Sequence, residues 1–133
     1  NSMVSFNHYA YGAIGDWLYR WAAGLQEAAP GFREIRIKPY LNDHFTSMKA
    51  EQRTPYGLAS SGWTKEGDAL TLTVEIPANT TAEVYVPSAA ADKVTESGRA
   101  LDGRSDLKVA GWDDGYTLVR LGSGRYEFRS TLK

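Results

Sequence analysis

Two histidines and the scattered carboxylates are the side chains of this sequence best suited to chemistry, because cysteine is absent. A nucleophilic serine would need a histidine oriented by a carboxylate, and an imidazole metal site would need several ligands at regular spacing. His8 and His44 each stand alone, and Asp43 beside His44 completes neither arrangement. The sequence therefore predicts no catalytic residue, no metal site and no cofactor site here, and His44 is interpreted as a solvated loop residue.

The adjacent carboxylates Asp113 and Asp114 are better explained by a turn than by catalysis. They precede Gly115 and separate two runs of alternating polarity, Leu107–Trp112 and Tyr116–Leu121. An Asp-Gly pair between such runs is typical of a tight β-hairpin. We therefore expect these acids at a hairpin tip.

Alternating polarity is the dominant pattern after Pro30 and indicates strands separated by turn residues. Eight or so short strands of this kind predict a mainly β domain, an antiparallel β-sandwich of jelly-roll or Greek-key type. The expected strands are Arg33–Lys38, Ser47–Arg53, Gly57–Lys65, Leu70–Ile76, Ala82–Pro87, a short one at Val94, Leu107–Trp112, Tyr116–Leu121 and Arg125–Arg129.

The residues before Pro30 have a different period and predict one N-terminal α-helix. A helix with so few charges is apolar on nearly all sides and requires burial on nearly all sides. We expect residues 1–30 to be a helical segment that needs cover from outside these residues, and residues 31–133 to be the sandwich. We also expect the isolated chain to self-associate through this helix, since large exposed apolar patches are normally interaction surfaces. The apolar positions with helical spacing are Ile14, Trp17, Leu18, Trp21, Ala22 and Leu25.

Length and charge narrow the class of protein further. A chain of 133 residues corresponds to one domain-sized core. Its net charge of −1 offers no broad basic field, so we expect no nucleic-acid partner. The longest apolar stretch is interrupted by Asp16 and Arg20, so we expect no membrane span. These residues carry no indication of the cellular compartment.

Six short strings occur in a consistent order along the chain. They are Asn7-His8-Tyr9-Ala10-Tyr11-Gly12, Ile14-Gly15-Asp16-Trp17-Leu18-Tyr19, Pro30-Gly31-Phe32, Ile35-Arg36-Ile37-Lys38-Pro39, Ile76-Pro77-Ala78-Asn79-Thr80-Thr81-Ala82 and Val86-Pro87. Together they resemble the C-terminal region of bacterial α-L-rhamnosidases, from a signature near the end of the catalytic α-barrel into a C-terminal β-sandwich. The resemblance implies that residues 1–30 are the terminal helical segment of an upstream α-barrel and that residues 31–133 are the C-terminal sandwich.

The resemblance implies a parent glycoside hydrolase that removes terminal α-L-rhamnose from rhamnosylated glycosides by inversion. In that family the general acid lies far upstream, and the general base lies shortly before the Asn-His-Tyr-Ala signature. The resemblance therefore implies that this fragment is structural and inactive by itself. It also implies that His8 contacts rhamnose in the intact parent, where an imidazole suits a sugar hydroxyl. In the isolated chain we expect His8 only to pack at the helix start.

Two other interpretations remain open from the sequence. The chain could be an autonomous, non-catalytic carbohydrate-binding sandwich, in which exposed aromatic rings stack on sugars. Alternatively, it could be a purely structural or interaction module. The candidate aromatic platforms are Tyr56, Trp63, Trp112 and Tyr116.

Overall fold

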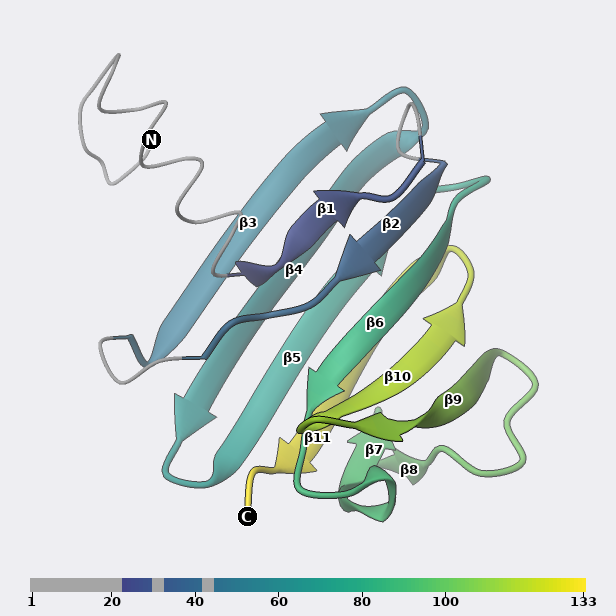
Figure 1. The fold of residues 1–133 in the computed structure, drawn as a ribbon. Coiled ribbons are helices and arrows are strands. Elements are labelled where there is room, and N and C mark those ends of the chain that lie inside the picture. The colour runs from purple at the N-terminus through teal and green to yellow at the C-terminus, as the bar shows by residue number, and fades with distance from the viewer. Residues whose placement is uncertain (1–22, 30–32, 42–44) are drawn as a thin grey trace.

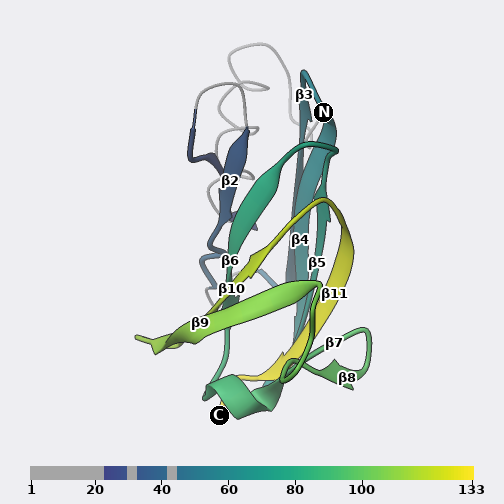
Figure 2. The same cartoon turned by 90° about the vertical axis from the view of Figure 1, so that its right-hand side faces the viewer.

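The chain folds into two β-sheets packed face to face (Figure 1). The computed structural model describes residues 23–29, 33–41 and 45–133. Seen edge-on in Figure 2, the sheets form two layers, with β2, β6, β10 and β9 in one and β3, β4, β5 and β11 in the other. The prediction of a mainly β sandwich is confirmed.

The first sheet has the strand order β1-β2-β6-β10-β9 and the second has the order β3-β4-β5-β11-β7-β8. Every strand expected from alternation is present, and a short 3₁₀ helix, η2 (Ala91–Lys93), precedes β7. The strands are β1 Leu25–Glu27, β2 Glu34–Ile37, β3 Ser47–Thr54, β4 Gly57–Glu66, β5 Ala69–Ile76, β6 Thr81–Pro87, β7 Val94–Glu96, β8 Arg99–Ala100, β9 Leu107–Asp113, β10 Tyr116–Leu121 and β11 Gly124–Thr131.

The first sheet is mixed, which corrects the expectation of a purely antiparallel sandwich. Strand β2 pairs with β6 in parallel, with Ile35 opposite Ala82 and Ile37 opposite Val84. Between these strands the chain builds β3, β4 and β5 of the opposite sheet. Such a crossover lets the chain return in the direction it left, whereas a tight hairpin would reverse it.

The predicted N-terminal helix lies largely outside the described residues, as do Trp17 and Trp21. Its expected end is wrong, however, because Leu25 begins strand β1 and pairs with Ile37. Gly24 has φ +79, a conformation that favours glycine and that ends helices. Residues 25–27 therefore belong to the first sheet, although the sequence pattern assigns them to the helical segment.

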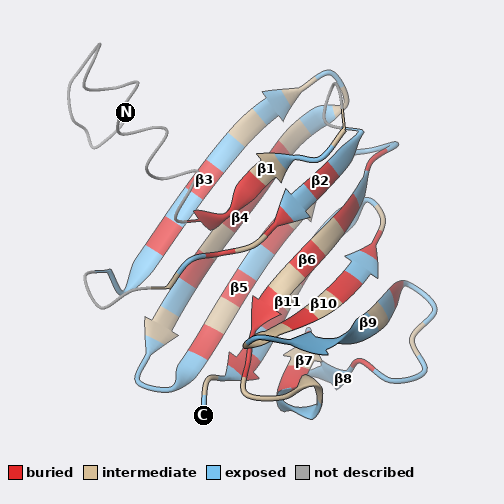
Figure 3. Cartoon of the chain, viewed as in Figure 1, coloured by how far each residue is buried: buried red, intermediate tan, exposed pale blue. Residues whose placement is uncertain are grey.

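The core lies between the two sheets, where alternate residues of each strand face inward (Figure 3). In β5 the buried positions are Leu70, Leu72, Val74 and Ile76, as their alternation predicts. The inward polar groups find partners, as buried polar groups must. Ser130 Oγ donates to Pro87 O at 2.6 Å, and the hydroxyls of Ser88 and Thr117 lie 2.7 Å apart.

Candidate functional site

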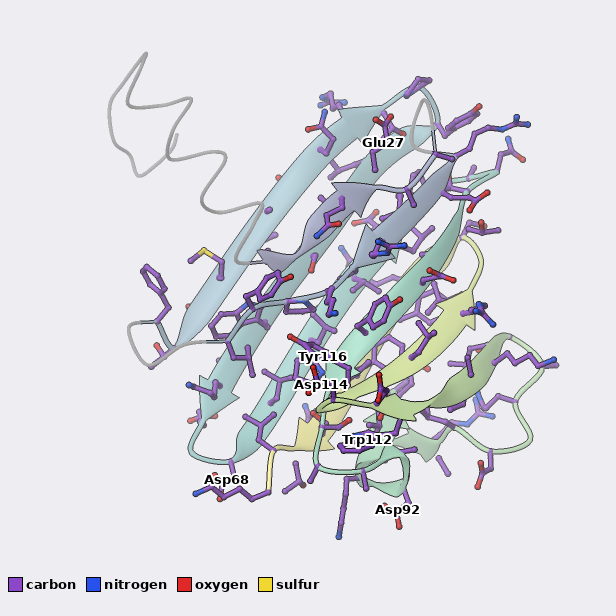
Figure 4. The ribbon with its side chains drawn as sticks, viewed as in Figure 1. Glu27, Asp68, Asp92, Trp112, Asp114 and Tyr116 are labelled. Atoms are coloured by element: carbon purple, nitrogen blue, oxygen red, sulfur yellow. The ribbon has the colours of Figure 1, made fainter. Side chains whose placement is uncertain are left out.

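The acids singled out in the sequence, Asp113 and Asp114, belong to no metal-binding group among the described residues. His8 and His44 lie outside the described residues. Within residues 23–29, 33–41 and 45–133, no cluster of three or more His, Asp or Glu side chains could hold a metal ion. Figure 4 shows Glu27, Asp68 and Asp92 at well-separated places on the fold.

The Asp113–Asp114 pair forms the expected hairpin tip. Asp114 and Gly115 have φ of 52° and 87°, the two positive values that a tight primed turn requires. Strands β9 and β10 flank this turn, with Asp113 opposite Tyr116. The prediction of turn chemistry at this position is confirmed.

The four candidate aromatic platforms differ in exposure. Trp63 is only 2% exposed and lies in the core, so its assignment as a sugar platform is wrong. Alternation explains this burial, because Trp63 follows Ala59 and Ser61 on the inward side of β4. Tyr56 is partly exposed in the β3–β4 turn, where its backbone N–H donates to Thr54 Oγ1.

Trp112 is the most exposed large apolar side chain in the described part of the chain, at 47%. Its Nε1 donates to Ser88 O at 3.0 Å, which fixes the indole at the sheet edge. The strand register places Trp112 opposite Thr117, a fully buried residue that faces the core. The indole therefore lies on the inner side of the first sheet, at its edge.

The outer side of the same sheet contains a hollow of about 360 Å³, whose lining includes Lys38, Tyr85, Gly111, Asp113, Tyr116 and Leu118. We call these residues the Lys38 hollow. The register explains how they meet: Tyr85, Leu118 and Gly111 form one row across β6, β10 and β9, and Tyr116 and Asp113 belong to the next row. Figure 4 shows Tyr116 and Asp114 together at the end of the β9–β10 hairpin.

Lys38 follows β2 and lies between two tyrosine rings. Its Nζ is 5.1 Å from the ring centroid of Tyr85 and 5.0 Å from that of Tyr116. The two rings meet edge to face, with centroids 6.2 Å apart. These contacts, together with a 2.9 Å hydrogen bond from Tyr116 Oη to Pro39 O, hold the ammonium and the rings in place. Burial raises the pKa of the Tyr116 hydroxyl, and nearby Tyr40 and Asp114 raise it further.

A β-bulge in β9 shapes the part of the hollow that this strand lines. Val109 pairs with Val119 and Gly111 pairs with Leu118, so Ala110 is an extra residue in β9. Gly111 has φ +143, which strongly favours glycine, and a Cβ there would meet no atom within 4 Å. The absence of a side chain at Gly111 therefore leaves the floor of the hollow open.

The second group with unusual chemistry is a buried ion cluster on the second sheet and the loop after β8. We call it the Glu96 cluster: Glu96, Ser97, Arg104, Asp106 and the backbone N–H of Glu127. Arg104 Nη2 donates to Glu96 Oε1 at 2.7 Å, and these side chains are only 6% and 4% exposed. Glu96 Oε2 accepts from Ser97 Oγ at 2.6 Å and from the Glu127 N–H at 3.0 Å. Arg104 also binds both carboxylate oxygens of Asp106, at 2.8 and 2.9 Å.

The net effect of these contacts is a lowered pKa for Glu96. Burial alone would raise the pKa of this carboxyl, but hydrogen bonds from Arg104, Ser97 and the Glu127 N–H outweigh it. The hydrogen bonds from Arg104 also lower the pKa of Asp106, and both carboxylates raise that of Arg104. The cluster is fully partnered and ties the loop after β8 to β7 and β11.

Sequence reasoning singled out Tyr116 and the acids of the hairpin tip but missed Lys38 and Tyr85 as their neighbours. One signal was available, because alternation in residues 82–87 places Tyr85 on the outward side. The position of Lys38 depends on the parallel β2–β6 pairing, which the sequence did not reveal. The Glu96 cluster left no local signal, because its members come from separate segments of the second sheet.

The N-terminal end of the described chain is fixed to both sheets. Ser61 Oγ of β4 donates to Ala23 O at 2.8 Å, and Lys38 N donates to Gly24 O at 3.0 Å. A Cβ on Gly24 would clash with the backbone of Lys38 and Pro39, so only glycine fits. Ala23 and Gly24 therefore form a junction that is hydrogen-bonded to both sheets.

The fold and its contacts define a β-sandwich domain whose N-terminal junction is hydrogen-bonded to both sheets. Residues 24–101 match the family described as the bacterial alpha-L-rhamnosidase C-terminal domain. The chain belongs to this family. Its matched segment begins at Gly24, the residue of the junction.

Full-length relatives and a solved structure agree with this assignment. The chain is 34% identical over 126 residues to an alpha-L-rhamnosidase of Streptomyces avermitilis, and 34% identical over 128 residues to one of Formosa agariphila. These alignments cover 95% and 96% of this chain but only 12% and 14% of the relatives. The crystal structure of the Streptomyces avermitilis enzyme complexed with L-rhamnose matches with a TM-score of 0.77 and 32% identity, over 96% of this chain and 12% of that one.

The expectation that the chain contains no membrane span can be compared with the structure only over the described residues. No helix among them has the length and apolar character needed to cross a bilayer.

Proposed function

We propose that this chain is the structural C-terminal part of an α-L-rhamnosidase, whose intact form removes terminal α-L-rhamnose from glycosides by inverting hydrolysis. The observation that carries the proposal is a complete sandwich that aligns with only 12–14% of the length of the relatives. Inversion requires two carboxyl groups about 6.5–9.5 Å apart across a sugar site. The proposal assigns those groups to the remainder of the parent protein.

The role of the fragment is to fold and to support that parent. The hydrogen-bonded junction at Gly24 supports this role, because it couples the preceding chain to both sheets through Ser61 and Lys38. We place the division between the helical segment and the sandwich near Gly24 instead of Pro30, since β1 already pairs within the first sheet.

Two further parts of the proposal concern residues outside those described. His8 contacts the bound rhamnose in the intact parent only, where its imidazole exchanges a hydrogen bond with a sugar hydroxyl. The isolated chain self-associates through its N-terminal segment, because Trp17 and Trp21 need cover that this sandwich supplies on one side at most.

The test compares the longer protein that contains this segment with the same protein ending before Gly24. We expect the truncated form to melt at a lower temperature and to lose aryl α-L-rhamnoside hydrolysis faster on heating. A milder variant, Ser61→Ala, removes only the hydrogen bond to Ala23 O and should produce a smaller shift in the same direction. Equal melting temperatures and equal heat resistance of all three proteins would overturn the structural role.

A further inference from the structure

The outer face of the first sheet has two halves, and among the described residues the charged side chains form ion pairs in one half but not in the other. In one half, Arg120 and Arg36 both approach the carboxylate of Glu83, with distances of 3.2 and 4.0 Å. In the other half lie Lys38, Asp113 and Asp114. Within the part of the chain that the structure describes, none of these three side chains forms an ion pair, and the Lys38 ammonium lies over the two tyrosine rings.

The unpaired groups surround a hollow with an apolar floor. Leu118 and the rings of Tyr85 and Tyr116 supply apolar surface, and Gly111 leaves room above it. Lys38 offers three N–H donors, while the Asp113 carboxylate, opposite Tyr116 in the register, offers acceptors. Apolar contact area and directed polar groups around one cavity are the usual features of a small-ligand site.

The balance of charge selects the class of ligand. Lys38 brings one positive charge to the lining of the hollow, whereas Asp113 and Asp114 bring two negative charges, so a phosphate or other anion would be repelled by the two acids. A cation would be repelled by Lys38, whose ammonium is held between the rings. A neutral molecule with many hydroxyls meets neither penalty, since it can donate to Asp113 and accept from Lys38.

A protein partner fits this hollow less well. The centres of protein–protein interfaces are depleted in lysine and aspartate, because burying unpaired charges is costly. A sugar ring leaves the edges of the hollow in water while its C–H face covers Leu118.

We infer that the Lys38 hollow binds a neutral sugar ring of a glycan. Its binding does not require that the proposed function be correct. It would hold a carbohydrate chain on the sandwich with weak affinity, with a Kd on the order of 1 mM, as expected for a small, open site.

The test is a titration of the 133-residue chain, followed by ¹H–¹⁵N NMR, with methyl α-L-rhamnoside, methyl β-D-glucoside and methyl β-D-galactoside as separate probes. We expect at least one probe to give saturable shifts confined to residues around Lys38, Tyr85, Gly111 and Tyr116. Lys38→Ala should weaken that binding roughly tenfold, since it removes a charge-assisted hydrogen bond. Arg120→Ala, in the paired half of the same face, should leave it unchanged.

Three outcomes would overturn the inference. They are no saturable shift with any probe, shifts centred elsewhere on the chain, or equal losses of affinity in Lys38→Ala and Arg120→Ala. A fourth measurement separates sugar binding from domain contact: strong protection of Lys38 from amine labelling in the longer protein, unaffected by the sugar, would assign the hollow to an interface and would also overturn the inference. None of these results depends on whether the longer protein hydrolyses rhamnosides.

Discussion

The Glu96 cluster and the Lys38 hollow both bring charges of opposite sign onto this small sandwich, but they do so in opposite ways. At Glu96, both carboxylate oxygens accept hydrogen bonds, and the side chain is 4% exposed. At Lys38, the ammonium lies over two rings, and the carboxylates of Asp113 and Asp114 remain without ion-pair partners in the described structure.

The difference separates a structural role from a binding role. A buried charge whose hydrogen bonds are all satisfied inside the protein has no capacity left for a ligand, and removing one partner leaves the other uncompensated. Exposed charges around an open hollow contribute little to folding but keep their donors and acceptors available. The comparison therefore predicts large stability effects at one site and small ones at the other.

The largest effect is expected for Glu96→Ala. This change leaves Arg104 and the Glu127 N–H without their buried acceptor, so the free energy of unfolding should fall by about 3 kcal/mol. Urea unfolding monitored by tryptophan fluorescence measures it. The matched control is Glu75→Ala, which removes an exposed ion pair with Arg125 and should cost less than about 1 kcal/mol. Similar losses in the two variants would contradict the structural role of the Glu96 cluster.

The second prediction concerns the loss of folding stability at low pH. The folded pKa of Glu96 is lowered, so in the unfolded chain this carboxyl takes up its proton at a higher pH than in the folded one. Its contribution to stability is therefore complete above about pH 4.5 and is lost as the pH falls through the folded pKa. Urea unfolding at a series of pH values should show a smaller acid loss in Glu96→Gln than in the original chain. If both proteins lose the same free energy over this range, the carboxylate is not the group that matters.

A smaller effect is expected for Lys38→Met, which keeps the aliphatic stem and removes the ammonium between Tyr85 and Tyr116. The lost cation–π contacts should lower the free energy of unfolding by about 0.5–1 kcal/mol. Chemical denaturation provides the value. A loss as large as that of Glu96→Ala would show that Lys38 is a structural residue and would remove the contrast between the two sites.

The smallest effect is expected for Asp113→Asn at the hairpin tip. Because its carboxylate has no ion-pair partner in the described structure, the free energy of unfolding should change by less than about 0.5 kcal/mol. Differential scanning calorimetry is sufficient to detect a larger change. A clear destabilisation would mean that the carboxylate supports the turn.

The sequence was most informative where the side-chain pattern is local. Alternation predicted β5 and its buried face, and the Asp-Gly pair predicted the β9–β10 turn. The spacing of Leu25 fits a helical period, but the positive φ of Gly24 turns the chain into β1 before that residue. Trp63 is not an exposed platform, and its alternation with Ala59 and Ser61 indicates the inward side of β4.

The two charged sites could not be predicted because they depend on pairings between distant segments. Lys38 reaches Tyr85 and Tyr116 only through the parallel β2–β6 pairing and the antiparallel β6–β10 pairing. Arg104 reaches Glu96 because the loop after β8 folds back on β7, and nothing in the local pattern of residues 101–106 specifies that path. Local polarity sets strand positions, whereas such sites require the register between strands.

We propose that this chain is a supporting domain and that the hydrolytic chemistry belongs to the rest of the parent protein. The most direct test is to incubate the purified 133-residue chain with 4-nitrophenyl α-L-rhamnopyranoside and to follow release of 4-nitrophenol. The account predicts no hydrolysis above the rate without protein, while the longer protein releases the product under the same conditions. Hydrolysis by the chain alone, abolished by a substitution within it, would contradict the account.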